Sequence, residues 1–256
     1  MKDECAGDPA MSSVVWIAHL SDLREALPGL EALLDVREQE RATRFRFPED
    51  RARFIAGRGL LRHGLRRYAP RVPASLEMIY SNLGRPYVPT AHDAPRFSIS
   101  HTRDLVALAF ADEAQVGLDL EYMKPSVDML ELAERILSED DFEAFQALLP
   151  GDRLAAFYRV WTRKEAYLKA RGEGISTGLP EVSVSFTAGA TSLVSDRRDS
   201  STEKWRLHAL PVPEDYMGYL ACDEADRPVA CFSAQVENGE VRLAAIAPSL
   251  PLPAAH

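Results

Sequence analysis

The sequence predicts an α+β protein built from two similar halves. Each half has the same order of elements, which is a strand, then helices that end in a long one, and then paired strands. The 256 residues are enough for one large domain or two small ones. Although no residue-level repeat accompanies this order, it predicts a duplicated α+β unit with a ligand cleft between the copies.

The N-terminal half is placed at residues 1–114. Its first apolar run contains β-branched residues, two stretches with helical periodicity follow, and Pro70 and Pro73 end the second of them. A cluster of turn formers then separates two short strands from each other. The expected elements are a strand at 14–18, helices at 21–34 and 38–68, short strands at 77–80 and 87–88, and a hairpin with strands at 96–100 and 105–111.

The C-terminal half is placed at residues 115–247. It begins with a strand-like run, continues with three helical stretches of which the last has the strongest pattern, and closes with strands after Gly172. The proline-rich residues 248–256 predict a flexible tail. The expected elements are a strand at 116–122, helices at 128–137, 141–149 and 154–170, and strands at 182–186, 205–210 and 216–222.

The charge distribution predicts a protein that does not bind nucleic acid but presents one basic and one acidic surface. The formal net charge is −9, which disfavours general nucleic-acid binding. Arginine crowds residues 37–71, whereas acidic residues dominate 112–152. A ligand that carries phosphates and needs a divalent cation would use both surfaces.

The cysteines and the hydropathy predict a cytoplasmic protein outside the membrane. Cys5, Cys222 and Cys231 form neither a CxxC motif nor a zinc-type spacing with histidine, and an odd number of them does not fit a disulfide framework. No run has the length and apolar character of a signal peptide or a membrane span.

Asp119 and Glu121 are the first candidate site. They stand two residues apart in the expected strand at 116–122, so strand alternation places both carboxylates on one face. Two adjacent carboxylates repel each other unless a positive charge lies between them, and a hard cation with oxygen ligands is the usual answer. The alternative is a half-exposed strand whose polar side faces water, and the spacing alone favours that alternative.

Glu165 and Lys169 are the second candidate site. Their i, i+4 spacing places a carboxylate and an ammonium on one face of the expected helix at 154–170. A surface ion pair is the alternative. That alternative is weakened by the aromatic surroundings of the pair, because Phe157, Tyr158, Tyr167 and Trp161, which lies one turn before Glu165, argue against a fully wet face.

Hydroxyl, imidazole and guanidinium groups supply candidate phosphate ligands. Ser100 and His101 stand at the end of an expected strand and can both donate to phosphoryl oxygens, whereas no acid follows at a spacing that suggests a hydrolytic triad. Arg85 lies in a Gly-Arg-Pro turn. Further arginines can bind an anion or pair with neighbouring acids, namely Arg41, Arg44, Arg46, Arg51, Arg53 and Arg58.

Three segments together resemble the signature of the surfactin-type 4'-phosphopantetheinyl transferase family. The segments are Phe97-Ser98-Ile99-Ser100-His101, Val116-Gly117-Leu118-Asp119-Leu120-Glu121 and Trp161-Thr162-Arg163-Lys164-Glu165-Ala166-Tyr167-Leu168-Lys169. Their order and spacing match, and the resemblance extends from about residue 41 to the final strands. It implies a monomer of two α/β subdomains related by a pseudo-twofold axis, with coenzyme A in the cleft between them.

The resemblance also implies roles for individual residues. Asp119, Glu121 and Glu165 match the family's ligands for Mg²⁺, which Mn²⁺ can replace, and Glu165 and Lys169 are the expected catalytic pair. Asp141 stands where some members have a glutamate proposed to assist catalysis. The residues expected to contact coenzyme A are Arg41, Arg53, Arg58, Arg85, Ser100, His101, Lys164 and Lys169.

The implied reaction moves the phosphopantetheine arm of coenzyme A to a serine of an apo acyl, aryl or peptidyl carrier protein and releases 3',5'-ADP. Glu165 is expected to take the serine proton, and Lys169 to stabilise the departing 3',5'-ADP. Two alternatives are a metal-dependent pyrophosphohydrolase of coenzyme A or a related nucleotide, with water in place of serine, and a non-catalytic module that only docks a partner.

Overall fold

The computed structural model describes residues 13–82, 84–89, 93–125, 128–173, 178–191, 193–199, 201–224 and 228–246. The expected tail at 248–256 lies outside these residues. The first part of the chain forms β1 (Ser13–His19), α1 (Leu20–Leu23), α2 (Leu27–Ala32), α3 (Val36–Thr43), α4 (Pro48–Tyr68), β2 (Ile79–Tyr80), β3 (Pro86–Tyr87), β4 (Arg96–Thr102) and β5 (Leu105–Ala111). The second part forms β6 (Val116–Tyr122), α5 (Met129–Ile136), α6 (Glu139–Gln146), α7 (Arg153–Arg171), β7 (Val182–Val184), β8 (Leu193–Asp196), β9 (Arg206–Ala209), β10 (Tyr216–Cys222), β11 (Val229–Glu237) and β12 (Glu240–Ala245).

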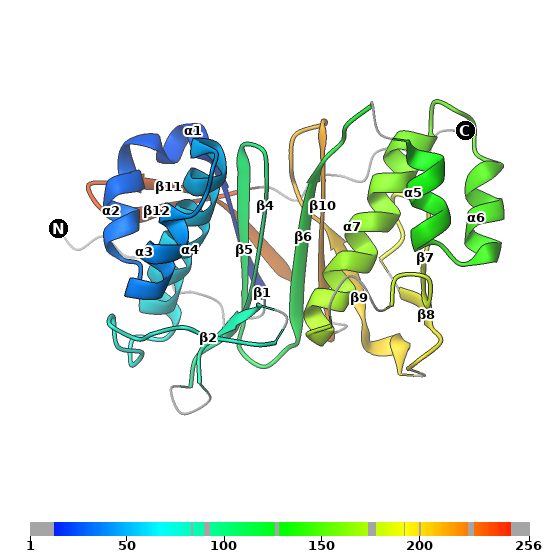
Figure 1. Cartoon of the computed structure of the whole chain (residues 1–256). Coiled ribbons are helices and arrows are strands. Elements are labelled where there is room, and N and C mark those ends of the chain that lie inside the picture. The colour runs from blue at the N-terminus through cyan, green and yellow to red at the C-terminus, as the bar shows by residue number, and fades with distance from the viewer. Residues whose placement is uncertain are drawn as a thin grey trace.

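Two sheets stand at the centre of the molecule, with helices on both outer sides (Figure 1). One sheet has the strand order β12-β11-β1-β5-β4, and the other has the order β6-β10-β9. The helices α1 to α4 cover the first sheet, and α5 to α7 cover the second (Figure 1). The predicted α+β class is confirmed, and the structure has the arrangement of two helix-covered halves that the order of elements predicted.

The core continues through all of these layers. In β1, Val14 and Trp16 pack toward the helices of the first half, whereas Val15 and Ile17 pack toward the second sheet. Strand alternation explains this, because successive side chains point to opposite faces and both faces of β1 are covered. The two halves therefore share a hydrophobic layer, and Leu118 of β6 lies within it.

The helix expected at 38–68 is two helices, α3 and α4, and the single-helix prediction was wrong. Pro48 is the first residue of α4, where its missing N–H is harmless, and Phe47 before it has extended backbone with φ −103° and ψ 131°. Asp35 and Glu38 form a capping box at the start of α3, which places Glu38 in the interior with 1% exposure. Buried Arg62 compensates both carboxylates, with Nη2–oxygen distances of 2.8 Å to each.

α7 is the central element of the second half, as its strong helical pattern predicted. It lies along β6 and β10, and it ends at Gly172, whose left-handed backbone with φ 73° suits glycine. Gly117 of β6 permits a very close approach, because a Cβ atom there would lie 2.1 Å from the Ala166 carbonyl oxygen and 2.2 Å from the Ala170 nitrogen. Strand and helix therefore touch backbone to backbone beside Asp119.

The last two strands, β11 and β12, do not join the sheet of the second half. β11 pairs in parallel with β1, and β12 pairs with β11, so both extend the first sheet. The division expected between residues 1–114 and 115–247 differs from this arrangement, since residues 229–245 belong by hydrogen bonding to the N-terminal sheet. Pairing across more than 200 residues leaves no local pattern in the sequence from which it could have been foreseen.

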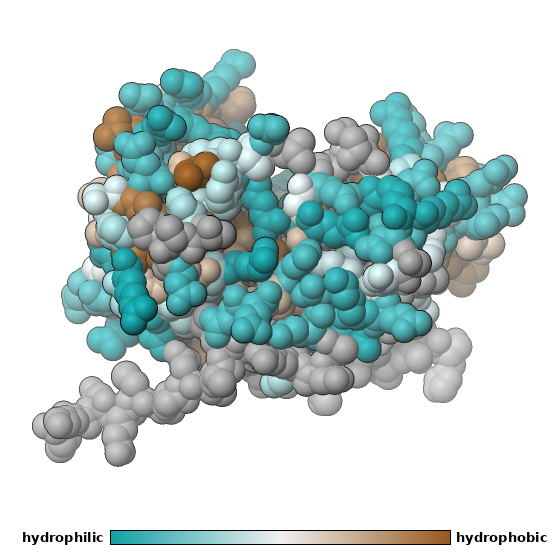
Figure 2. Space-filling model, turned by 90° about the horizontal axis from the view of Figure 1, so that it is seen from below, coloured by the Kyte–Doolittle hydropathy of each residue, from teal (hydrophilic) through white to brown (hydrophobic). Residues whose placement is uncertain are grey.

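The surface seen from below in Figure 2 is predominantly hydrophilic. This agrees with a core that takes up most of the large apolar side chains. None of the helices among the described residues combines the length and apolar character that crossing a bilayer requires.

Candidate functional site

A cleft of about 680 Å³ lies between the two halves, and both halves contribute to its walls. The first half supplies side chains from α3, α4, the turn that leads into β3, and β4. The second half supplies the end of β6 and one face of α7. The three carboxylates expected to hold a metal, Asp119, Glu121 and Glu165, all line this cleft together with Lys169.

The carboxylates reach the cleft for the geometric reasons that their spacing suggested. Asp119 and Glu121 are alternate residues of β6, and Glu165 and Lys169 are one helical turn apart in α7. The backbone contact at Gly117 brings the two elements together. Lys169 Nζ then lies 2.6 Å from Asp119 Oδ1, which joins the strand candidate and the helix candidate into one site.

Burial disfavours the charged forms of the three carboxylates in this site. Asp119 and Glu165 are only 4% and 2% exposed. Burial, together with the neighbouring carboxylates, raises the pKa of Glu165 to about 7, and burial and the Asp119 carboxylate raise the pKa of Glu121 to about 7 as well. Burial also raises the pKa of Asp119 despite its ion pair with Lys169. Three carboxylates thus share one ammonium.

Two buried carboxylate oxygens in the site, Asp119 Oδ2 and Glu165 Oε1, have no hydrogen-bond partner among the residues that the structure describes. Unpaired buried acceptors are rare and call for a physical reason. A set made only of carboxylate oxygens suits a hard divalent cation. As the side chains stand, no three acidic, histidine or cysteine side chains among the described residues are arranged to hold a metal ion, so binding one would require these carboxylates to turn toward one another.

An indole and a hydroxyl group also contact the carboxylates and orient them. The Trp161 indole donates to the carboxylate of Glu121 and opposes the rise of its pKa. Ser100 Oγ is 7% exposed and donates to Asp119 Oδ1 at 3.2 Å. It also accepts from Lys169 Nζ at 3.4 Å. Ser100 therefore lies within the site as expected, in contact with the acidic cluster.

His101 lies between the cleft and a second hollow of about 470 Å³. His101, Glu121 and Trp161 line both spaces. Desolvation and the nearby Arg53 guanidinium lower the pKa of His101. Arg53 lines only the second hollow, where it pairs with Asp50 and donates to the Arg103 carbonyl at 3.0 Å.

Arg41 and Arg58 line the cleft from the first half, as expected for groups that bind an anion. Arg58 is 8% exposed, its Nε lies 3.7 Å from Glu38 Oε1, and its Nη1 has no hydrogen-bond partner within the described ranges. Burial lowers the pKa of Arg58. Arg41 is exposed and stacks over Phe54, with 5.2 Å between its Cζ atom and the ring centroid. Both guanidinium groups have donors available to an anion.

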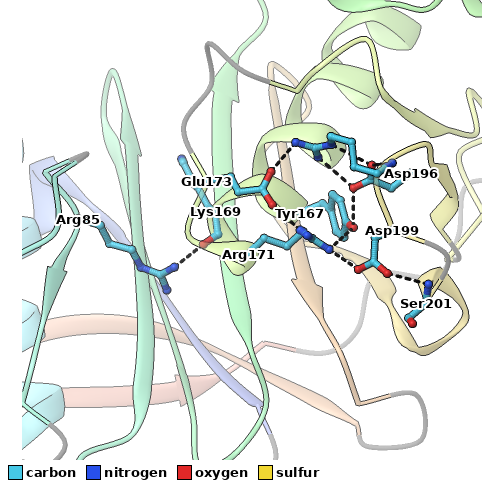
Figure 3. Close-up of polar contacts among 9 residues, drawn as sticks. Arg85, Tyr167, Lys169, Arg171, Glu173, Asp196, Asp199 and Ser201 are labelled. Atoms are coloured by element: carbon cyan, nitrogen blue, oxygen red, sulfur yellow. Dashed lines mark hydrogen bonds and ion pairs between the residues drawn. The ribbon is translucent and has the colours of Figure 1, made fainter.

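Arg85 lines the cleft as expected, and its guanidinium also donates to backbone carbonyls of several elements. Its Nη2 donates to the carbonyls of Phe97 at 3.1 Å and Val116 at 3.3 Å, and its Nη1 donates to the Lys169 carbonyl. Figure 3 shows this reach from the first half to the end of α7. Arg85 thus ties β4, β6 and α7 together beside the cleft.

The end of α7 is held on its other side by a network of charged groups (Figure 3). Arg171 pairs with Glu173 at 2.6 Å and with Asp199, and it also donates to the Tyr167 hydroxyl at 3.2 Å. That hydroxyl donates in turn to Asp196 at 3.0 Å. These contacts fix the turn that carries Lys169.

Lys164 and Asp141 do not line the cleft, and the expectation that Lys164 contacts coenzyme A there does not fit the structure. Lys164 is fully buried, and its Nζ donates to the carbonyls of Ile136 at 2.8 Å and Leu179 at 2.9 Å. The adjacent Glu165 points to the cleft because neighbouring residues on a helix face different directions. Asp141 accepts from the Ser183 hydroxyl at 2.9 Å on the same side as Lys164.

Two residues that shape the site were not identified from the sequence. Gly117 sets the approach of α7 to β6, and Trp161 contacts Glu121. A glycine inside a strand that precedes two acidic residues is the signal that could have identified the first, because such a glycine often marks a close backbone approach. An aromatic one turn before Glu165 was noted, but its partner lies on another element.

Comparisons with known proteins agree across nearly the whole described chain. Residues 16–113 match the family model described as "4'-phosphopantetheinyl transferase, N-terminal", and residues 115–222 match the model described as "4'-phosphopantetheinyl transferase superfamily". The chain is 37% identical over 175 residues to the 4'-phosphopantetheinyl transferase HetI of Nostoc sp., which covers 68% of this chain and 73% of HetI.

Two further relatives show the same similarity. A putative 4'-phosphopantetheinyl transferase, slr0495 of Synechocystis sp., is 33% identical over 202 residues, covering 78% of this chain and 80% of its own. A 4'-phosphopantetheinyl transferase of Bacillus subtilis is 31% identical over 153 residues, which cover 60% of this chain and 66% of the relative. All three matches extend over more than half of both chains.

Proposed function

Since this chain belongs to the 4'-phosphopantetheinyl transferase superfamily, we propose that its cleft moves the phosphopantetheine arm of coenzyme A to a serine of an apo carrier protein. The observation that carries this proposal is the meeting of Asp119, Glu165 and Lys169 in one cleft between the halves. The relatives reported above are named as transferases, so the pyrophosphohydrolase alternative has no support. The products are the holo-carrier protein and 3',5'-ADP.

The activity is proposed to depend on Mg²⁺, with Mn²⁺ as a substitute. Asp119, Glu121 and Glu165 would hold the ion, because they offer oxygen ligands only and two of their oxygens are buried without a hydrogen bond. When bound, the ion would offset negative charge on the pyrophosphate of coenzyme A. It would also favour the charged form of the carboxylates, which burial now opposes.

Two residues of the chain, Glu165 and Lys169, are proposed to act on the reacting groups. Glu165 lines the cleft and is placed to take the proton from the serine hydroxyl as the serine oxygen forms a bond to the pantetheine-bearing phosphorus. The bond from that phosphorus to 3',5'-ADP breaks in the same step. Lys169 is placed to stabilise the charge that develops on the departing phosphate.

The arginines and the second hollow suggest where the two substrates lie. Arg58 and Arg41 are proposed to bind the 3'-phosphate, since both line the cleft and Arg58 Nη1 has no hydrogen-bond partner in the described part of the chain. The carrier is proposed to approach from the second hollow, which shares Glu121 and Trp161 with the cleft. Arginine and lysine side chains on its wall suit an acidic carrier helix, and these are Arg53, Arg103 and Lys124.

The chain is further proposed to belong to the surfactin-type subfamily and to act as a cytoplasmic monomer. Both halves of the cleft come from one chain, so the site needs no second copy. Cys222 and Cys231 are free thiols, which suits a reducing compartment. The arrangement of two subdomains is proposed as residues 13–114 with 229–245, and residues 115–224.

Transfer should be measured by intact mass. Purified protein is incubated with coenzyme A, Mg²⁺ and apo-carrier proteins from fatty-acid, polyketide and peptide synthesis. We expect one carrier to gain the mass of the arm, chelation of the metal to abolish the gain, and Mg²⁺ to restore it. A reaction without any carrier tests the rival, because coenzyme A consumed there at the same rate would indicate a hydrolase.

A further inference from the structure

The two sheets meet along a seam between β4 and β6, which is defined here by residues 98–102 and 118–122. Each of these strands is the edge strand of its own sheet. The two strands stand side by side in the centre of Figure 1. An edge strand has a row of backbone N–H groups that need acceptors, and in the interior these cannot be left to water.

At this seam the backbone N–H groups of β6 donate to side-chain hydroxyls of β4, and not to backbone carbonyls. Leu118 N–H donates to Ser98 Oγ at 3.0 Å. Leu120 N–H donates to Ser100 Oγ at 3.2 Å, and two residues later the Tyr122 N–H donates to Thr102 Oγ1 at 3.3 Å. The spacing is constant, so alternate residues of β4 serve alternate residues of β6. We call these three bonds the hydroxyl ladder.

The hydroxyl ladder brackets the carboxylates of the site. Asp119 lies between the anchored peptides of Leu118 and Leu120, and Glu121 lies between those of Leu120 and Tyr122. The side chains of Asp119 and Glu121 therefore leave a strand that is held immediately before and after each of them. Because strand alternation gives both side chains the same face, fixing these peptides fixes the direction of both carboxylates.

We propose that Ser98 and Thr102 are positioning residues for the transfer reaction, which hold the β6 backbone so that Asp119 and Glu121 face Glu165. This role rests on the function proposed above. Ser100 serves the same ladder but also touches Asp119 directly, so the two outer hydroxyls separate positioning from direct contact. Thr102 lines the second hollow and not the cleft, whereas Ser98 lines the cleft, is 6% exposed and accepts from the Leu118 N–H at the seam.

A positioning role differs from simple cohesion between the sheets. The shared hydrophobic layer, which includes Leu118, Leu120 and Val15, already holds the sheets together without the ladder. Loss of one outer hydroxyl should therefore leave the fold intact while it releases one peptide of β6. The carboxylate next to that peptide would then lose its fixed direction, and metal affinity and turnover would fall together.

The test compares Thr102→Val and Ser98→Ala with Thr102→Ser, which keeps the hydroxyl. Manganese affinity is measured by electron paramagnetic resonance without a carrier, amide hydrogen exchange is measured at Leu118 and Tyr122, and kcat and KM for coenzyme A are measured with the carrier. We expect Thr102→Val to accelerate exchange at Tyr122 and to weaken Mn²⁺ binding about 10-fold, with a similar fall in kcat and little change in KM. Ser98→Ala should do the same through Leu118, and Thr102→Ser should restore the wild-type values.

Faster exchange with unchanged Mn²⁺ affinity and kcat would overturn the proposal, because the hydroxyls would then hold the sheets without orienting the carboxylates. Unchanged exchange in both variants would overturn it as well. The binding measurements need no transfer, so they remain decisive even for a wild-type protein that labels no carrier. That last result would count against the proposed function and not against the ladder.

Discussion

Replacing Glu165 with glutamine is expected to lower kcat/KM for carrier labelling by about 10³-fold, which corresponds to about 4 kcal/mol of transition-state stabilisation. Glutamine keeps the size of the side chain but cannot take the serine proton, and it removes one negative charge from the proposed metal site. Initial rates of labelling, measured by intact mass at saturating Mg²⁺, would give this number.

The same change should not weaken the fold. Glu165 is 2% exposed, and burial and its neighbours oppose its charged form, so a neutral side chain of the same shape relieves an unfavourable interaction. We expect the Tm in the absence of metal to stay level or rise. Glu143→Gln, the same change on an exposed position of α6, is the matched control and should alter neither quantity. Wild-type kcat/KM in Glu165→Gln would exclude the assigned role.

Replacing Gly117 with alanine is expected to reduce both stability and activity. The added Cβ would lie 2.1 Å from the Ala166 carbonyl oxygen and 2.2 Å from the Ala170 nitrogen, and these are backbone atoms that cannot rotate away. Helix α7 must therefore move off β6. We expect a loss of about 3 kcal/mol in the free energy of unfolding, at the upper end for overpacking, measured by chemical denaturation.

Activity should fall in the same variant for a geometric reason. Shifting α7 separates Lys169 Nζ from Asp119 Oδ1, which now lie 2.6 Å apart, and moves Glu165 with it. We expect labelling to fall by at least about 10²-fold at a temperature where the variant is still folded, since small displacements of catalytic groups have large effects. Gly151→Ala is the control, because a Cβ there meets no atom within 4 Å. A Gly117→Ala variant with normal labelling would show that the backbone contact does not set the site.

Local sequence patterns predicted those helices and strands whose formation depends on neighbouring residues in the chain. The hairpin of β4 and β5 and the helix α7 follow from alternation and from helical periodicity, and the structure has them within two residues of the expected bounds. The break between α3 and α4 was missed, although Pro48 marks it, because apolar residues recur at helical spacing on both sides. The pairing of β11 with β1 is long-range and has no local signal.

The sequence predicted two pairs of site residues, but it did not predict that the two pairs lie together. Helix geometry places Glu165 and Lys169 on one face, and strand geometry does the same for Asp119 and Glu121. Neither rule says that the two faces meet. That depends on the contact at Gly117, and only the structure or the resemblance to a known family brings the pairs together.

The roles of buried cations were least predictable. Arg85 and Lys164 were both expected to contact coenzyme A, and in the structure each donates to backbone carbonyls of several elements, but Arg85 lines the cleft and Lys164 does not. Sequence shows which groups carry charge, but the number of acceptors that surround a side chain is a property of the packed chain. Arg58 shows the reverse case, in which a buried guanidinium retains an unpaired nitrogen at the cleft.

The central claim is that a strand and a helix from one half of the chain supply three carboxylates to a single divalent cation. Mn²⁺ titration followed by electron paramagnetic resonance, in the presence of coenzyme A, tests it on the wild type and on Asp119→Asn, Glu121→Gln and Glu165→Gln. We predict one Mn²⁺ site in the wild type and affinity at least about 10-fold weaker in each of the three variants. Wild-type affinity in any one of them would contradict a site shared by all three carboxylates.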